Sequence, residues 1–252
     1  MHYQYDGSFL GFLSVIYQAY HDGTSHVEKI ENLSAGPTLF GNEKNISLNT
    51  AHSEKVLKSL YQQCGARATH ILYYAFMAEQ PEREMILFYY ICCAFRYKKT
   101  FAQQKYDPWI QQVEHWSLKT SNERHRMLGL IRFNELEEGM MYANIHPDYN
   151  IVPLLAGHFT NRMPNERWAI HDLHRHIAAY YDKQNVVIAD VTEPERNIKY
   201  SQNEEEFRSI WYRYYCHIAI KERTNPALQR SFMPKKYWPY LTEMNYSKQK
   251  TL

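Results

Sequence analysis

Residues 168–190 have the sequence WAIHDLHRHIAAYYDKQNVVIAD. Three short runs within this stretch, at 168–171, 175–181 and 185–190, are rich in aromatic, β-branched and small apolar residues, which favour strands. Short polar connections separate the runs. Because connections this short join antiparallel neighbours, the stretch predicts three strands of a mostly antiparallel sheet.

A hairpin and two helices are predicted around these strands. The apolar residues of 127–136 and 140–146 lie close together, and Gly139 occupies the loop position where a hairpin needs a positive φ. Apolar residues recur at helical spacing over 150–162 and again over 204–221. The second half of the chain therefore combines a sheet with helices.

The first half of the chain is predicted to be mainly helical. Apolar residues recur at helical spacing over residues 8–20, 50–64, 66–79, 82–104 and 107–122. Ser8 and Thr50 are suited to cap two of these helices, and Gly65 is suited to end one. Loops and one or two short strands are expected over 23–47, where Gly, Asn, Ser and Pro are frequent.

These patterns together predict an α+β fold. In this fold a helical first half packs on an antiparallel sheet in the second half, and a C-terminal helix with a basic and aromatic tail closes the structure. No linker composition interrupts the sequence, so residues 1–252 are expected to form a single domain. The alternative is a helical subdomain at 1–126 and an α+β subdomain at 127–252.

The composition is that of a globular protein. Of the 252 residues, 44% are hydrophobic and 22% are charged, which excludes disordered, collagen-like and coiled-coil chains. The 29 basic and 27 acidic residues give a net charge of +2, so a nucleic-acid-binding surface would have to be a local patch. The chain contains 22 Tyr, 11 Phe and 5 Trp, whose rings either fill a core or stack on bases.

The cysteines and the N-terminus indicate a cytoplasmic protein. Cys64, Cys92, Cys93 and Cys216 include no Cys-x-x-Cys pair and are expected to be buried and reduced. The first residues lack the basic start and apolar stretch of a signal peptide, and the longest apolar run, 85–95, is about half of a bilayer span. We therefore expect no association with a membrane.

Common catalytic signatures are absent from the sequence. It contains no Walker loop, dinucleotide-binding glycine pattern, Gly-x-Ser-x-Gly elbow or His-Glu-x-x-His motif. It also lacks the tight group of three cysteines that a radical-SAM iron–sulfur cluster requires, so the chain is not itself a radical-SAM enzyme. No cofactor is predicted, and the sequence leaves open whether the protein is an enzyme.

The densest group of polar residues lies between His158 and His176. His158 and Arg162 are four residues apart on a predicted helix and share a face, where they could bind one phosphate. Asp172 could orient an imidazole or pair with Arg175. His158 and Asp172 are therefore candidate catalytic residues, and Arg162 and Arg175 are candidate phosphate-binding residues. For each of them the alternative is a purely structural role.

Three histidines in the same region raise the question of a metal. Imidazoles bind zinc, iron and copper, and the region contains His171, His174 and His176. On a strand His174 and His176 would share a face that His171 does not. We therefore expect hydrogen-bonded or solvated histidines, with a metal site at these three residues as the alternative.

Basic charge is concentrated near the C-terminus. Residues 196–252 contain 11 Lys or Arg and five Asp or Glu. Basic and aromatic residues are interleaved there, as in grooves that pair with phosphates and stack bases. The candidate nucleic-acid-binding residues are Arg223, Arg230, Lys235, Lys236, Tyr237 and Trp238. The alternative is a wrapped segment whose rings fill the core while its lysines stay in water.

Six segments together resemble a known bacterial family. They are YDGSFLGFL from Tyr5, RFNEL from Arg132, YANIHP from Tyr142, HFTNR from His158, WAIHDLHR from Trp168, and ERTNP through MPKKYW from Glu222. In these segments and in their order, nearly the whole chain resembles a family of DNA-metabolism or DNA-repair proteins classed as a domain of unknown function. The family supplies no established catalytic residues to carry over.

The resemblance implies a role in DNA repair. Members of the family occur beside a radical-SAM DNA-repair protein, and in some chains the domain is joined to a uracil-DNA glycosylase-like module. The first hypothesis is an accessory protein that binds damaged or single-stranded DNA and works with the radical-SAM partner. The second is an enzyme acting on a nucleotide or modified base through His158, Arg162 and Asp172. The third is a protein–protein adaptor without nucleic-acid affinity.

Overall fold

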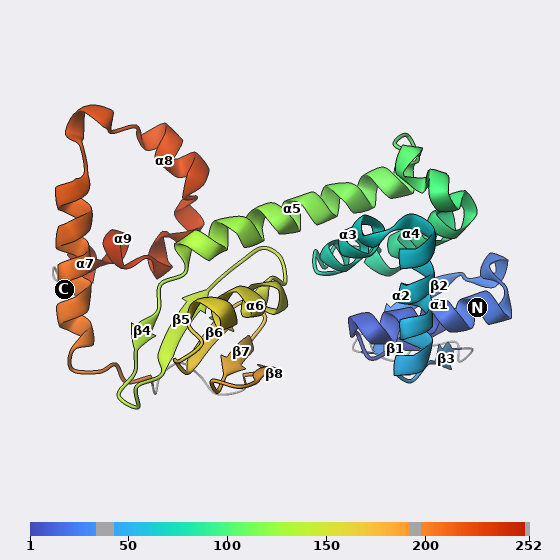
Figure 1. Ribbon diagram of the computed structural model, residues 1–252, viewed down its shortest axis with the longest axis horizontal. Helices are drawn as coiled ribbons and strands as arrows, with labels where there is room; N and C mark the ends of the chain where they lie inside the picture. Colours follow the sequence, from blue (N-terminus) through green and yellow to red (C-terminus); the bar gives the residue numbers. More distant parts are fainter. Residues whose placement is uncertain (34–42, 192–197, 250–252) are drawn as a thin grey trace. The chain divides into compact units, whose positions relative to one another are not determined.

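The computed structural model describes residues 1–33, 43–191 and 198–249 (Figure 1). The chain forms two compact units, Met1–Ser121 and Asn122–Leu252. Helix α5 (Pro108–Leu130) contains the boundary between them. No helix in the described ranges has both the length and the apolar character needed to cross a bilayer.

The N-terminal unit combines helices with a small parallel sheet. Its strands are β1 (His2–Tyr5), β2 (Lys29–Asn32) and β3 (Glu43–Asn45), in the order β2-β1-β3. Its helices before α5 are α1 (Phe9–Asp22), η1 (Thr24–His26), α2 (Thr50–Cys64), α3 (Ala66–Phe76), α4 (Arg83–Tyr97) and η3 (Lys98–Gln103). Two of the strands fall within the region where one or two were expected, and residues 34–42 of that region lie outside the described residues.

The caps of α1 and α2 show why these helices begin where they do. The hydroxyl of Ser8 accepts a hydrogen bond from the amide of Gly11, as predicted. Helix α2 spans the predicted residues, but its cap is Asn49 and not Thr50, because the Asn49 side chain accepts from the amide of His52. The Ser14 and Ser53 hydroxyls, 3.0 Å apart, join α1 to α2 in the core.

The C-terminal unit contains a five-stranded sheet and the remaining helices. Its strands are β4 (Asn134–Glu135), β5 (Met141–Ile145), β6 (Trp168–Asp172), β7 (Ile177–Tyr181) and β8 (Val186–Asp190), in that order across the sheet. Its helices are α6 (Val152–Arg162), α7 (Glu204–Ile218), η5 (Lys221–Arg223), α8 (Pro226–Phe232), η6 (Lys235–Tyr240) and α9 (Thr242–Gln249). The α+β prediction is confirmed.

The sheet is mixed and not wholly antiparallel. β6, β7 and β8 pair antiparallel as predicted, and so do β4 and β5. β5 and β6 instead pair parallel, with Met141 opposite Trp168. The physical reason is the crossover through α6, which returns the chain to the same end of the sheet before β6 begins.

The first strand of the hairpin is much shorter than predicted. Helix α5 continues to Leu130, so most of the predicted strand 127–136 is helical or irregular. Glu123, Met127 and Ile131 explain the difference, because they are buried at four-residue intervals on one side of the helix and its end. The predicted turn itself is present, with Gly139 at a φ of 73°.

The two faces of the sheet have different environments. Trp168 lies in β6 and contacts Phe159 of α6, with ring centroids 6.3 Å apart, so this face carries the apolar core. Tyr142 and Ala169 lie on the opposite face and pack with Leu136. This second face leads to the C-terminal helices.

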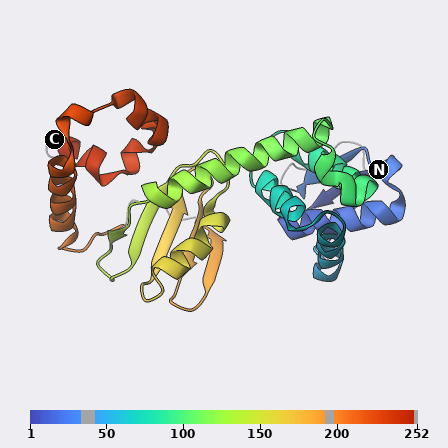
Figure 2. The same cartoon turned by 45° about the horizontal axis from the view of Figure 1, so that its top comes forward.

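Helices α7 and α9 pack against each other beyond the β4 edge of the sheet (Figures 1 and 2). Glu204 at the start of α7 accepts a hydrogen bond from the backbone amide of Glu135, which ties the helix to β4.

Cys216 in α7 is exposed and Cys93 is buried, so the expectation that all four cysteines are buried is wrong.

Candidate functional site

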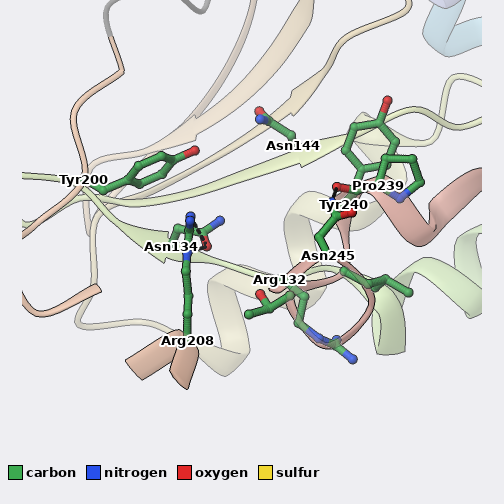
Figure 3. Close-up of a pocket in the computed structure, with 10 residues that line it drawn as sticks. Arg132, Asn134, Asn144, Tyr200, Arg208, Pro239, Tyr240 and Asn245 are labelled. Carbon is green, nitrogen blue, oxygen red and sulfur yellow. Dashed lines mark hydrogen bonds between the residues drawn. The ribbon is translucent and has the colours of Figure 1, made fainter. Parts of the chain in front are cut away.

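A polar pocket lies on the sheet face opposite α6. Asn134 in β4 is paired with Tyr142 in β5, and Asn144 lies two residues further along β5, so alternation along the strands places all three on this face. The pocket volume is about 170 Å³. Its lining residues, shown in Figure 3, are Arg132, Asn134, Asn144, Tyr200, Arg208, Pro239, Tyr240, Leu241, Thr242 and Asn245.

The rings and amides have a clear arrangement in the pocket. Figure 3 shows Tyr200 and Tyr240 on opposite sides, with Asn144 between them and Asn134 beside Arg208. The pocket walls come from two strands, the segment after α5, α7, η6 and α9. Elements far apart in the sequence therefore meet around this volume.

Arg132 is held by a carboxylate at the pocket wall. Its Nη2 and Nε donate to the two carboxylate oxygens of Glu243 at 2.6 and 3.1 Å. Trp211 also donates to Glu243, at 2.9 Å. Burial alone would raise the pKa of Glu243, but the hydrogen bonds from Arg132 and Trp211 outweigh burial and lower it. The arginine and its carboxylate are thus both charged near neutral pH.

Arg208 is fixed in a second paired position. Its Nε donates to Glu204 at 2.9 Å, and its Nη2 donates to the Oδ1 of Asn134 at 2.9 Å. The guanidinium also lies over the ring of Tyr200, 4.5 Å from the centroid. These contacts orient the Asn134 amide and the Tyr200 ring at the pocket.

Asn144 brings an unsatisfied polar group to the pocket. Its Oδ1 atom is buried and accepts no hydrogen bond from the described residues. A buried acceptor without a donor costs about 1–3 kcal/mol. The oxygen itself has almost no accessible surface, so a ligand could reach it only after the amide rotates.

A wider apolar groove runs along α7. It has a volume of about 1000 Å³. Phe207, Ile210 and Tyr214 of α7 line it and are 60%, 53% and 54% exposed. The other lining residues are Arg132, Phe133, Glu135, Met141, Met163, Glu166, Glu204, Arg208, Trp211 and Thr242. Large apolar side chains exposed together are typical of an interaction surface.

The segment from Arg208 to Lys236 is strongly basic. It contains seven basic residues and one acidic residue. Arg208 pairs with Glu204, and Lys236 pairs with Glu123 and Asp148. The other five form no ion pair with any described residue. They are Arg213, Lys221, Arg223, Arg230 and Lys235, which we call the cationic set.

Asp172 and Arg175 lie together at the turn after β6. Asp172 is fully buried and accepts from the amides of His174 and Arg175 at 2.9 and 3.3 Å and from the Arg175 guanidinium at 3.0 Å. Arg175 also donates to the carbonyls of Pro147 and Asp148. This network stabilises the turn and leaves both side chains largely enclosed.

His158 and Arg162 lie in α6 as predicted, away from the residues that line the polar pocket. His158 is half-buried with its ring against Phe159, and Arg162 is exposed. No hydrogen bond joins either of them to Asp172 in the part of the chain that the structure describes. The structure therefore does not assemble the predicted trio through direct contacts.

The histidines of the β6–β7 region contact different neighbours. The Nδ1 of His171 lies 2.7 Å from the hydroxyl of Tyr142, and the ring of His174 is near that of His146. His176 has a φ of 54° in the turn. Within the described ranges, no three His, Cys, Asp or Glu side chains are grouped in a way that could hold a metal ion.

The predicted basic and aromatic tail divides into two parts. Lys236 and Tyr237 both donate to the Oε1 of Glu123, at 3.0 and 2.5 Å, and Tyr237 is buried. Burial raises the pKa of Tyr237, and its hydrogen bond to Glu123 adds to the increase. Trp238 donates to the carbonyl of Met233. Arg223, Arg230 and Lys235 are exposed and belong to the cationic set. The contacts of Lys236, Tyr237 and Trp238 attach the segment to the rest of the unit.

Sequence reasoning missed the main residues of the pocket. Arg132, Asn134 and Asn144 fall within the conspicuous segments RFNEL and YANIHP, but nothing local shows that these segments meet η6 and α9. Arg208 lies in a segment whose pattern predicts an amphipathic helix but does not indicate a pocket residue. A polar residue such as Asn144 inside an otherwise apolar strand was the available signal.

A family model described as a domain of unknown function, DUF4130, matches residues 81–243. The matched region includes the whole five-stranded sheet and every residue of the pocket lining except Asn245. No curated protein and no solved structure matches the chain.

Proposed function

We propose that this chain, which belongs to the DUF4130 family, binds single-stranded or locally opened DNA as an accessory protein of DNA repair. The cationic set is the observation that carries the proposal. Its five side chains lie within 23 residues of one another, from Arg213 to Lys235, and none is neutralised by a described carboxylate. Unopposed cations of this kind attract a phosphate backbone and release its counterions.

Exposed aromatic rings accompany these cations. Phe232 in α8 is 71% exposed and Tyr214 in α7 is 54% exposed. Rings that are not used in a core can stack on unpaired bases, which present a π face whatever their sequence. Cations and rings on one segment favour a single strand over a duplex, whose bases are already stacked.

The salt dependence of DNA binding tests the proposal. If all five cations contact phosphates, the slope of log K against log salt for a single strand is expected to be about −3.5, at about −0.7 per contact. The double variant Arg213→Ala, Arg230→Ala should bind more weakly and reduce the slope by about 1.4. Fluorescence anisotropy with single- and double-stranded oligonucleotides over a salt series measures both quantities.

Two further variants locate the surface. Arg162→Ala shows whether the exposed end of α6 belongs to it, and Lys58→Ala in the N-terminal unit is the matched control. The control should leave the slope unchanged. A wild-type protein that binds no oligonucleotide at low salt would contradict the proposal, and an unchanged slope in the double variant would remove the cationic set from it.

A radical-SAM DNA-repair protein is the proposed partner, as the resemblance implies. The groove along α7 supports a protein partner, because its exposed Ile210 is aliphatic and contributes little to base stacking. This observation also favours the adaptor hypothesis as the second candidate function. In that case the protein would bind its partner without binding DNA.

A groove variant tests the partner proposal. Ile210→Asp should weaken the complex with the purified radical-SAM protein at least tenfold, because a carboxylate would replace an apolar contact. Isothermal titration calorimetry measures the affinity. Leu118→Asp, which alters a side chain that is 59% exposed in the other unit, is the matched control. Equal affinities for the two variants would show that the partner does not use this groove.

A further inference from the structure

We infer that the polar pocket seats one nucleobase of the bound strand and that Asn144 reads its hydrogen-bonding edge. The inference rests on the proposed function, since it assumes that a single strand reaches the C-terminal unit. It adds the class of group that the pocket takes. The observations behind it are the pocket's size, its charge balance and its unsatisfied amide.

The size of the pocket fits one planar ring system. A cavity of about 150 Å³ holds a benzene ring, whereas sites for whole drug-sized ligands or cofactors usually need about 300–1,000 Å³. The pocket volume of about 170 Å³ is near the lower figure. The pocket therefore suits a base without its sugar and phosphate, which would remain outside.

The charge balance favours a neutral group over a phosphate. Each guanidinium in the pocket wall already has a carboxylate partner, Arg132 with Glu243 and Arg208 with Glu204. A phosphate entering the pocket would meet these carboxylates as well as the arginines. A nucleobase is neutral at pH 7, so it encounters no such repulsion and can use the remaining polar groups.

The Asn144 amide supplies the hydrogen bonds that a base requires. Asn144 lines the pocket, and its Oδ1 is buried without a donor, so the amide must rotate for that oxygen to accept from a base. If the amide were turned by 180°, its Nδ2 would occupy that position and would be the group in need of a partner. In both orientations one amide can offer an acceptor and a donor, the pairing that Asn makes with adjacent groups on a base edge.

Two tyrosine rings and helix α7 surround the pocket. Tyr200 and Tyr240 stand on opposite sides of the pocket in Figure 3, with the hydroxyl end of Tyr200 directed toward its middle. Arg208 lines the pocket, and Arg213 of the cationic set follows five residues later on α7, about 7.5 Å along the helix axis. Because five residues also turn about 140° around the helix, a strand with a base in the pocket would have to pass around α7 for its next phosphates to reach the cations.

Abasic oligonucleotides provide the test. Wild-type protein should bind a homopolymer about tenfold more tightly than a backbone of the same length made of abasic residues, because stacking and edge contacts contribute per base. Asn144→Ala should reduce this ratio to below about threefold while leaving affinity for the abasic backbone unchanged. Asn144→Ser should behave similarly, because the shorter serine hydroxyl cannot offer a separate donor and acceptor to adjacent groups on a base edge. Asn161→Ala, on the exposed side of α6, is the matched control and should retain the full ratio.

The outcomes separate this inference from the proposed function. Absence of binding to every oligonucleotide would contradict both. Equal wild-type affinity for the homopolymer and the abasic backbone would leave DNA binding in place and overturn the seated base. A full ratio in Asn144 variants whose thermal unfolding midpoint matches that of the wild type would overturn the role of Asn144.

Discussion

Replacing Glu123 by Ala is expected to lower the free energy of unfolding of the C-terminal unit by about 3–5 kcal/mol, the usual cost of removing one partner from a buried charged pair. Glu123 is only 2% exposed. Its Oε1 accepts from the backbone amide of Asp148 and from the side chains of Lys236 and Tyr237. Its Oε2 accepts from the backbone amide of Tyr149. The substitution would leave these four donors without their acceptor, in a region with little access to water.

The charge of Lys236 adds to this cost. Hydrogen bonds to Asp148, Tyr237 and Glu123 raise its pKa even though burial alone would lower it, so the folded protein favours the charged ammonium. Asp148 would remain as a partner after the substitution, but its carboxylate is largely exposed and screened by water. The C-terminal segment would therefore lose its strongest attachment to α5.

Urea unfolding and amide hydrogen exchange measure the effect. The amides of Asp148 and Tyr149 should lose protection more than those of β7, because their acceptor is the group removed. Glu123→Gln keeps one acceptor oxygen and the side-chain volume, so we expect a smaller loss of about 1–3 kcal/mol. Glu138→Ala, at an exposed turn position, is the matched control. If Glu123→Ala cost no more than this control, the attachment would not depend on Glu123.

The fold was predictable where local patterns decide it. Residues 50–64 form the predicted helix because Val56 and Leu60 are buried on one side of it and Gly65 follows with a φ of 82°. The strands β6, β7 and β8 likewise follow from their composition and short turns. In both cases the information lies within a few residues of the element that forms.

The errors arose where distant segments decide the structure. The parallel pairing of β5 with β6 joins strands that are separated along the chain by α6, so no short connection sets their relative direction. The pattern of α5 beyond 126 was ambiguous, because closely spaced apolar residues suit a strand or a buried helix equally. Burial of Met127 and Ile131 resolved the ambiguity in favour of the helix.

The candidate site was predictable only in part. Exposed cations such as Arg223 and Arg230 could be selected from local charge, which no packing contradicts. The partner of Lys236 lies 113 residues away at Glu123, and a sequence pattern carries no sign of such a contact. The pocket around Asn144 depends on still more distant segments, so its residue types were visible but their meeting was not.

Asp172 gives the second large prediction. Asp172→Ala is expected to lower the free energy of unfolding by about 3–5 kcal/mol, because the Arg175 guanidinium would lose its buried carboxylate partner in an enclosed site. The Arg175 side chain is 12% exposed, and that of Asp172 is fully buried. Arg175 also holds the carbonyls of Pro147 and Asp148, so the loss would extend from the β6–β7 turn to the segment after β5.

Asp182 in the β7–β8 turn is a matched control for this effect. It accepts from the amides of Gln184 and Asn185, much as Asp172 accepts from those of His174 and Arg175. These hydrogen bonds lower the pKa of Asp182, but it has no arginine partner among the described residues. Asp182→Ala should therefore cost much less than Asp172→Ala, because it removes two hydrogen bonds at an exposed turn and no ion pair.

The difference between the two variants isolates the buried ion pair. Both substitutions remove a carboxylate that accepts from two backbone amides at a turn, so the larger cost of Asp172→Ala measures the Asp172–Arg175 interaction together with the burial of its site. Urea unfolding at pH 7 gives both values. Equal costs would show that the Asp172–Arg175 pair adds no stability beyond the hydrogen bonds to the two amides.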